Sequence, residues 1–407
     1  SDLSKMMALR TRHFTRAATT LRCCFSTDAP LRKTPLHAIH VDNGANMTGF
    51  GGWDMPLYYA DGIMKEHTWC RENAGLFDVS HMLGIKITGK DRVQYAERFL
   101  PAGIKELKEG DGQLTSIPNA NGGLIDDCIV TNAGDHLFLV INAGHEDKDI
   151  PHMQAVLDDF EGSAAIEPQT GNGILALQGP KAIDVMTELA DEAVDWEHFR
   201  FMTGRDLKIS GIDCFVTRSG YTGEDGFELS CAGSDAAALS NSITNNKAVK
   251  LIGLGARDSL RLEAGLCLYG NDIDDETNPI EAGLLWTIGK RRREEGGFVG
   301  SDKILAVLAD RKNLVTKKRV GLTLAGKGPP PRAGDLLFND EGEQIGQLTS
   351  GVFGPSAKKA VAMGYVEKKY GLKSFTGTVK VQIRKKQFDM KISPMPFHPT
   401  NFYQGGK

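Results

Sequence analysis

Two adjacent carboxylates, Asp126 and Asp127, follow a glycine turn and are the first candidates for chemistry in this sequence. The turn glycines, Gly122-Gly123, can adopt the positive φ angles of a tight hairpin, and the apolar, β-branched run that ends at Val130 predicts a strand. Side chains alternate along a strand, so the two carboxylates point to opposite faces. We expect Asp127 to share the packed face with the two isoleucines of the run, and Asp126 to belong to the turn.

A carboxylate on an apolar face is costly unless a charged or hydrogen-bonding group meets it. Two interpretations of the pair follow. One is a turn aspartate that caps its own loop, which is the better interpretation for an isolated Asp-Asp pair. The other is a carboxylate held in a pocket for chemistry. Features elsewhere in the sequence are needed to distinguish the two interpretations.

The elements that would position this pair are predicted from hydrophobic periodicity. An antiparallel meander of three strands is expected to contain it, and a glycine-rich loop at 218–226 is expected between two further strands. His81, in a polar trio on a strand, is interpreted as a structural histidine. The meander strands are expected at 114–118, 124–131 and 136–142, and helices at 63–73, 90–100, 146–160, 234–244, 255–265 and 301–308.

The last third of the chain has a different character. Five short strands are predicted there, separated by Gly and Pro clusters, which is typical of a small all-β barrel or jelly roll. A domain boundary is expected between 290 and 314, where the charge run Lys290–Arg293 is interpreted as a solvated linker. The strands are expected at 319–324, 344–349, 360–366, 378–383 and 388–392.

Length and composition exclude several classes of protein. A chain of 407 residues can form two or three domains. The net charge of -4 argues against nucleic-acid binding, and no apolar run approaches the ~20 residues of a membrane-spanning helix. The seven scattered cysteines form no CxxC pair, which argues against a zinc ribbon or disulfide framework and for a reducing compartment. Dinucleotide, P-loop, zinc-protease and α/β-hydrolase motifs are also missing from the sequence.

The amino terminus has the composition of an organellar targeting segment. Residues 3–26 contain no acidic side chain, and Arg10, Arg12, Arg16 and Arg22 alternate with apolar, Ser and Thr residues. This amphipathic, arginine-rich pattern predicts a mitochondrial transit peptide over residues 1–26, removed near Ser26. The alternative is a basic arm that stays on the protein.

Six blocks of the sequence carry a resemblance: Phe50–Trp53, Leu76–Met82, Gly122–Val130, Ser219–Gly226, Ala256–Asp272 and Met363–Val366. Together they resemble one family, the aminomethyltransferase (T-protein) of the glycine cleavage system. The resemblance extends from about Thr34 to Tyr403. It implies an α+β, three-domain, cloverleaf-like fold with antiparallel sheets and a C-terminal β-barrel around a central folate hole. The expected regions are 31–290, divided into 31–82 plus 171–290 and 83–170, and a barrel at 315–403.

The resemblance also implies an activity and a location. The family transfers a methylene group from the aminomethyl-lipoyl arm of the partner H protein to tetrahydrofolate, with release of ammonia and formation of 5,10-methylenetetrahydrofolate. Tetrahydrofolate is thus expected as a co-substrate and no metal is expected. Expected partners are the lipoylated H protein and the other glycine cleavage subunits, without nucleic acid or membrane, in the mitochondrial matrix.

Three charged residues match functional positions of the family. Asp127 matches its catalytic carboxylate, expected to orient the reacting pterin nitrogen and stabilise a cationic methylene species. Glu228 matches the glutamate that contacts the guanidine-like pterin edge, and its alternative is a solvent-facing strand residue. Arg257 matches a ligand-binding arginine, and its alternative is a helix-surface residue.

Five further residues are expected at the folate hole. Asn142, Tyr221 and Trp286 match positions that line it, although plain core packing is nearly as good an interpretation for Trp286. The family ends in Asn-Tyr-Tyr, whereas this chain has Asn401-Phe402-Tyr403. Phe402 therefore keeps the stacking area without the hydroxyl, which Tyr403 could partly replace.

Three alternatives of other classes remain. One is a folate-dependent demethylating domain of the dimethylglycine or sarcosine oxidase type, and another is a non-catalytic folate-binding protein of iron–sulfur assembly. The third is a purely structural or interaction module. If the protein is the transferase, the cationic run Lys290–Arg293 is our expected docking face for the acidic H protein.

Overall fold

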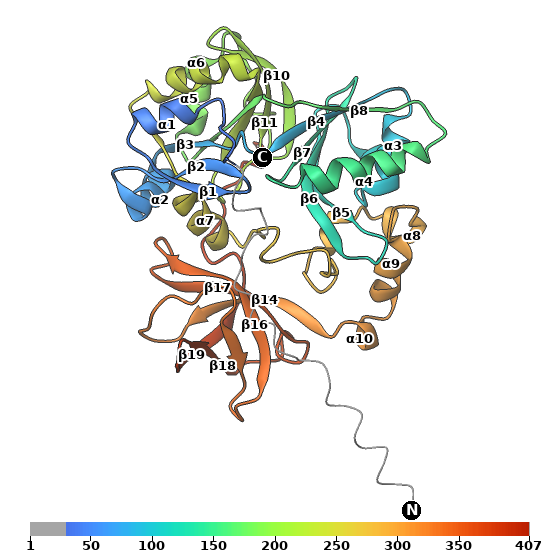
Figure 1. Ribbon diagram of the computed structural model, residues 1–407, viewed down its shortest axis with the longest axis vertical. Helices are drawn as coiled ribbons and strands as arrows, with labels where there is room; N and C mark the ends of the chain where they lie inside the picture. The colour runs from blue at the N-terminus through green and yellow to red at the C-terminus, as the bar shows by residue number, and fades with distance from the viewer. Residues whose placement is uncertain (1–29, 407) are drawn as a thin grey trace, which may run out of the picture.

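Two sheets lie side by side above a barrel in the computed structural model, which describes residues 30–406 (Figure 1). The predicted transit peptide, residues 1–26, lies outside the described residues. Among those described, no helix combines the length and the apolar character needed to cross a bilayer. The mixed α and β composition agrees with the predicted fold class, and each of the three units has its own apolar core.

The first unit is a six-stranded sheet in the order β10-β11-β12-β9-β3-β13. Its neighbouring strands are antiparallel, as predicted, except for the edge pair β13 and β3, which is parallel. The reason is the helix α6 (Gly233–Thr244), which carries the chain from β12 over the sheet to β13, and such a crossover produces parallel strands. The strands are β3 (Ala74–Asp78), β9 (Gly173–Gln178), β10 (Thr203–Ile209), β11 (Ile212–Arg218), β12 (Gly226–Cys231) and β13 (Val249–Leu251).

Helices cover both faces of this sheet. Strand β9 is buried throughout, because Leu175 and Leu177 join the core under α5 (Ala182–Leu189) and α6, whereas Ile174 and Ala176 join the core on the opposite face. That opposite core is formed with α2 (Gly62–Glu72) and α7 (Leu254–Glu263). A strand covered on both sides reads as a continuous apolar run, as seen here.

The second unit is a five-stranded sheet in the order β5-β6-β7-β4-β8, and it contains the predicted meander as β5, β6 and β7. The helices α3 (Arg92–Phe99) and α4 (Glu146–Asp158) pack on one face. The strands are β4 (Leu83–Thr88), β5 (Gly112–Pro118), β6 (Leu124–Asn132), β7 (Leu137–Ile141) and β8 (Ala165–Pro168).

The third unit is a closed barrel in the order β14-β17-β16-β15-β18-β19, which confirms the predicted C-terminal barrel. The five predicted strands are present, and β15 was not predicted because it is only three residues long. Closure leaves no exposed sheet edge. The strands are β14 (Lys317–Leu324), β15 (Leu336–Phe338), β16 (Gln344–Gly354), β17 (Lys359–Glu367), β18 (Thr378–Ile383) and β19 (Lys386–Ser393).

Short elements connect these units. The predicted domain limits, 31–82 plus 171–290, 83–170 and 315–403, stay a proposal. The remaining elements are α1 (His37–Asp42), β1 (Asn46–Phe50), β2 (Trp53–Tyr58), η1 (Ile104–Glu106), η2 (Leu285–Thr287), α8 (Arg292–Glu295), α9 (Ser301–Ala309) and α10 (Arg311–Leu314).

The charge run at 290–293 is not a solvated linker. Arg291 forms ion pairs with Glu97 at 2.5 Å and Glu106 at 2.6 Å, and the buried Arg292 donates to the Glu97 carbonyl at 2.6 Å. Arg293 donates to two backbone carbonyls at 2.9 Å. The expected docking face therefore loses its main support, because these three guanidinium groups are already engaged within the chain.

Helix α7 joins the six-stranded sheet to the barrel through buried charges. Glu263 accepts hydrogen bonds from the backbone of Ser356 at 2.8 Å and lies 3.1 Å from Arg71 and 3.2 Å from His67. On the same helix, Arg261 donates to the barrel hydroxyl of Ser350 at 2.8 Å. Burial opposes the charge of Glu263, but His67, the barrel backbone and Arg71 outweigh it and lower the pKa of this carboxyl to about 2.

We expect Glu263→Gln to destabilise the protein at pH 7 by roughly 1.5–3 kcal/mol, because it removes the buried carboxylate that Arg71 and His67 share, and leaves Arg71 paired only with Glu224 at 2.7 Å. Urea unfolding monitored by circular dichroism measures the effect. The gap should narrow as the pH falls from 4.5, the carboxyl's ordinary pKa, toward about 2, where protonation removes the same charge from the unsubstituted protein. Asp213→Asn, in an exposed ion pair with Lys208, is the control and should leave the midpoint unchanged. Equal midpoints for Glu263→Gln and the control would contradict a role in joining the units.

Candidate functional site

The strand β6 presents its two aspartates to opposite faces, but the packed face is not the one predicted. Asp126 is fully buried with Cys128 in the core under α3 and α4, whereas Asp127 and Ile129 are half-buried on the other face. The alternation argument grouped Asp127 with Ile125 and Ile129 correctly but chose the wrong face as the core. The assignment of Asp126 to the turn is also wrong, because it lies within the strand.

The face that carries Asp127 is turned toward α7. Val140 pairs with Ile129 across the sheet and packs, with Met82, on the core that includes Ala256 of α7. Nη2 of Arg257 lies 3.9 Å from the Met82 sulfur. Asp127 therefore lies on the side of its sheet that faces the six-stranded unit.

Asn142, at the end of β7, connects the two aspartates. Its Nδ2 lies 2.8 Å from Oδ1 of Asp126 and 3.0 Å from Oδ1 of Asp127. Burial and the neighbouring charge of Asp126 raise the pKa of Asp127 to about 7. A carboxyl that titrates near neutrality can both accept and return a proton at physiological pH.

Glu228 and Arg257 form the second half of the site. Glu228 is buried on β12 and accepts from the Ser219 hydroxyl at 3.1 Å, so its interpretation as a solvent-facing residue is wrong. Burial raises the pKa of Glu228, and the charge of Arg257 acts in the opposite direction. Arg257 is half-buried, and its Nη1 has no hydrogen-bond partner among the described residues, so the plain helix-surface interpretation does not hold. An unmatched guanidinium group is suited to an acceptor on a ligand.

Tyr221 lies between the two halves. The Arg257 guanidinium stands over its ring at 4.7 Å from the centroid, and its hydroxyl donates to the carbonyl of Cys267. Burial raises the pKa of Tyr221, and the charge of Asp127 adds to the rise, whereas Arg257 opposes it. Asp127 and Arg257 therefore both act on the same tyrosine from different units of the fold.

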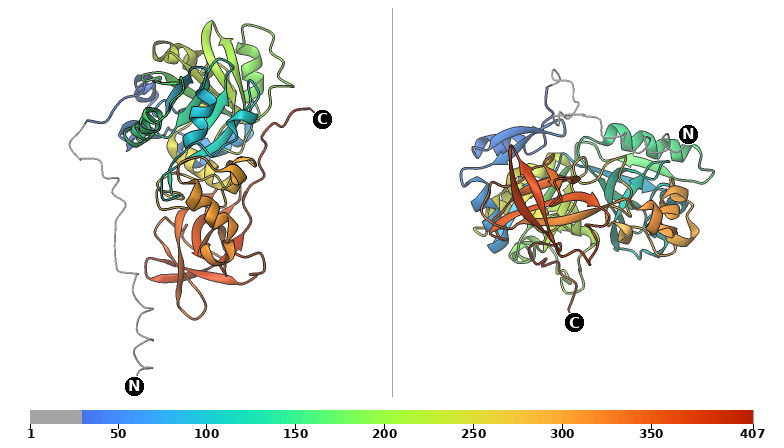
Figure 2. Two further views of the ribbon diagram at one scale, coloured as in Figure 1. Left: turned by 90° about the vertical axis from the view of Figure 1, so that its right-hand side faces the viewer. Right: turned by 90° about the horizontal axis from the view of Figure 1, so that it is seen from below.

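Trp286, Phe402 and Tyr403 make their contacts elsewhere. Trp286 is 56% exposed in η2, so its interpretation as core packing is wrong. The C-terminal segment runs from the barrel up the side of the molecule (Figure 2). There Phe402 stacks on Phe201 with a centroid distance of 4.0 Å, and Tyr403 lies under the Arg218 guanidinium at 4.0 Å. Their contribution to folate binding stays a prediction.

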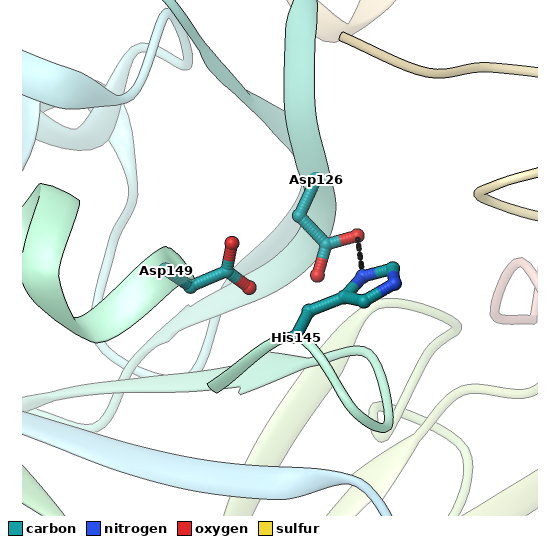
Figure 3. Close-up of side chains that lie close together, drawn as sticks. All are labelled: Asp126, His145 and Asp149. Atoms are coloured by element: carbon teal, nitrogen blue, oxygen red, sulfur yellow. Dashed lines mark ion pairs between the residues drawn. The ribbon is translucent and has the colours of Figure 1, made fainter. Parts of the chain in front are cut away.

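Two residues near Asp126 were not predicted from the sequence. His145 and Asp149 precede and begin α4, and Figure 3 shows both side chains directed at Asp126. His145 Nδ1 lies 3.2 Å from Asp126 Oδ1, and one ligand atom of each of the three residues lies within 4.8 Å of the others. Carboxylate and imidazole donors at this spacing could hold a divalent cation. The spacing of four residues between His145 and Asp149 was the available signal, but only the fold places Asp126 opposite them.

Comparison with known proteins covers almost the whole chain. The GCVT N-terminal domain matches residues 36–292, and the glycine cleavage T-protein C-terminal barrel domain matches residues 317–398. The chain is 45% identical to "Aminomethyltransferase, mitochondrial" of Solanum tuberosum over 94% of each chain. It is also 45% identical to the protein of that name from Mus musculus, covering 92% of this chain and 91% of the relative.

A solved structure shares the fold. The glycine cleavage system aminomethyltransferase T from Bartonella henselae superposes with a TM-score of 0.85 at 38% identity, covering 92% of this chain and all of that one. Identity of this level over nearly the full length, together with both domain matches, shows that the chain belongs to the glycine cleavage T-protein family.

Proposed function

We propose that this chain is a tetrahydrofolate-dependent aminomethyltransferase of the glycine cleavage system. Its relatives are named as aminomethyltransferases, and this chain matches them over nearly their whole length. Methylene transfer from the aminomethyl-dihydrolipoyl arm of H protein to tetrahydrofolate gives 5,10-methylenetetrahydrofolate, ammonia and dihydrolipoyl H protein.

The reaction sets clear requirements for the protein. The methylene carbon loses its bonds to sulfur and to the amino nitrogen and gains bonds to two folate nitrogens. The two protons that leave the folate nitrogens go to the thiolate and to ammonia, so no oxidant or reductant is needed. The protein must orient the folate, accept and return protons, and stabilise positive charge at the migrating carbon.

The observation that carries the proposal is Asp127, whose carboxyl titrates near 7 on the face directed at α7. In its ionised form it can orient the reacting pterin nitrogen and stabilise the cationic methylene group, which in turn favours ionisation. Asn142 holds this carboxylate at 3.0 Å. Asp127 is therefore the proposed catalytic residue, and Asn142 orients it.

The buried Glu228 is proposed to accept hydrogen bonds from the guanidine-like edge of the pterin. The unmatched Nη1 of Arg257 is proposed to donate to an acceptor on the folate. The ring of Tyr221 holds the Arg257 guanidinium in place through a cation–π contact. Trp286, Phe402 and Tyr403 are proposed as additional folate contacts on the strength of the family resemblance alone. A metal is not required by any of these steps.

The location and partners follow from the same family. The relatives are named mitochondrial, which supports the expected transit peptide and a site of action in the mitochondrial matrix. The lipoylated H protein is the proposed partner, together with the other glycine cleavage subunits. The charge set of the buried Glu228 and the half-buried Asp127 and Arg257 favours catalysis over a non-catalytic folate binder.

We expect Asp127→Asn to bind tetrahydrofolate normally but to transfer methylene at least ~100-fold more slowly, the usual contribution of a positioned acid–base group. Calorimetric titration with tetrahydrofolate, followed by an assay with aminomethylated H protein, separates the two effects. Asp213→Asn, on an exposed strand position, is the control. Normal turnover by Asp127→Asn would exclude the proposed role and favour a non-catalytic folate-binding protein.

Glu228→Gln tests the pterin contact. Loss of a charged acceptor from a buried site should weaken tetrahydrofolate binding by roughly 10- to 100-fold, the effect of ~1.5–3 kcal/mol for a charged hydrogen bond. The same titration measures it, and Glu197→Gln, at an exposed position, is the control. Unchanged affinity would remove Glu228 from the folate site.

The charge of Asp127 should also reduce stability. Because the folded state raises the pKa of this carboxyl, ionisation costs folding free energy as the pH rises from about 4 toward 7 and above. We therefore expect Asp127→Asn to melt at a higher temperature than the unsubstituted protein at pH 8, and at the same temperature near pH 4. Scanning calorimetry at the two pH values tests this, and a variant that is less stable at pH 8 would contradict the burial of the charge.

A further inference from the structure

The carboxyl group of Asp149 is buried without a hydrogen-bond partner. It lies in the first turn of α4, is 0% exposed, and neither oxygen has a partner among the described residues. Its nearest acidic neighbour is Asp126, also 0% exposed, and the two carboxyl groups face each other (Figure 3). An ionised carboxylate in this position would be an unpaired buried charge, which is strongly unfavourable.

The surrounding charges do not remove this cost. Lys148 donates to the carbonyl of Ile125 and lies 3.9 Å from the centroid of the Tyr269 ring, so its ammonium is shared with other groups. His145, from the start of α4, approaches Asp126 rather than Asp149. The carboxylate of Asp127 on β6 adds negative charge beside Asp149, and that of Asp275, on the loop after α7, adds it beside Lys148.

The hydrogen bonds indicate which carboxyl group carries the negative charge. Asp126 accepts from the backbone N–H of Asn142 at 3.1 Å and from its side chain at 2.8 Å, and it faces the imidazole of His145. Asp149 has no donor directed at it, so it is the group that must supply one. Two facing carboxyl groups in a dry site do not both ionise, and the proton stays on the group with fewer donors.

We propose that Asp149 is a neutral carboxylic acid that shares its proton with Asp126, and that this pair, through Asn142, positions the carboxylate of Asp127. The inference rests on the proposed function, because the role of Asp149 is to support Asp127.

The shared proton matters for the site because Asn142 contacts both aspartates of β6. With one negative charge on the pair, the Asn142 amide directs its Nδ2 to Asp126 and Asp127 at 2.8 and 3.0 Å. A second charge on Asp149 would raise the pKa of Asp127 further and favour its inactive, protonated form. Asp149 is thus a positioning residue: it touches no reacting atom and acts through Asp126 and Asn142.

The test combines a direct readout of the proton with kinetics. Infrared difference spectra of the complete protein at pH 8.5, where Asp127 is mostly ionised, with aspartate labelled at the carboxyl carbon, should contain one strong protonated carboxyl band. That band should vanish in Asp149→Asn and persist in Asp147→Asn, an exposed substitution in the same helical turn. The absence of a protonated carboxyl in the unsubstituted protein would overturn the proposal.

Kinetics distinguish positioning from a merely structural effect. Asp149→Asn keeps a neutral donor of the same shape, so its kcat and the pH midpoint of its rate should remain close to those of the unsubstituted protein. Asp149→Ala removes the donor and should lower kcat on the order of 100-fold with an unchanged KM for tetrahydrofolate. Equal loss in both variants would overturn the proposal, and if Asp149→Ala does not fold, the spectra and Asp149→Asn still decide.

Two controls separate this inference from its rivals. If Asp127→Asn retains activity, the proposed catalytic role fails, whereas the spectra still report on the shared proton. Titration of EDTA-treated protein with Zn²⁺ tests a cation in place of the proton. Stoichiometric binding that Asp149→Asn abolishes and Asp147→Asn preserves would overturn the shared proton and assign a divalent cation to Asp126, His145 and Asp149.

Discussion

The proposed site depends on how one strand, β6, accommodates two negative charges. Asp126 and Asp127 are consecutive on β6, so alternation sends one carboxylate into the core of its own unit and the other toward the neighbouring unit. Asn142 donates hydrogen bonds to both carboxylates, at 2.8 and 3.0 Å, and so connects the core face of β6 to the face that meets the neighbouring unit. Burial, together with the negative charge of Asp126 nearby, raises the pKa of Asp127 into the range useful for chemistry.

The rest of the architecture brings a complementary charge to that strand. Helix α7 carries Arg257 toward the Asp127 face, and its last turn is fixed to the barrel through Glu263 and to the six-stranded sheet through Arg71. The three units are therefore held in register by the helix that also supplies a proposed ligand-binding residue. Buried charges, which are costly to stability, gather at this junction and beside β6. The proposed catalytic role of the site gives a reason for those beside β6.

Much of the architecture could be predicted from the sequence. Periodicity located the meander and the barrel strands, because each is a run of alternating or continuous apolar residues between glycines. The three residues of β15 and the parallel pairing of β13 could not be found this way, since both depend on distant partners. The charge run at 290–293 was misinterpreted because its partners, Glu97 and Glu106, are almost 200 residues away.

The residues of the proposed site were predicted from the family resemblance more than from the pattern of the sequence itself. Asp127, Asn142, Glu228, Arg257 and Tyr221 were identified from the family resemblance, whereas the alternation argument for Asp127 chose the wrong packed face. Sequence periodicity indicates which residues share a face of a strand, but it does not indicate which face of the sheet the helices cover. Asp149 was missed for a related reason, because an acidic residue in the first turn of a helix is ordinarily a surface residue that favours the helix dipole.

The pH dependence of methylene transfer with aminomethylated H protein tests the central claim most directly. We expect kcat to rise through an ionisation near pH 7 as Asp127 loses its proton, and Asp126→Asn to move this midpoint to lower pH by removing the neighbouring negative charge. A rate that is independent of pH between 5.5 and 8.5, in a protein that binds tetrahydrofolate and turns over, would contradict a catalytic carboxylate at position 127.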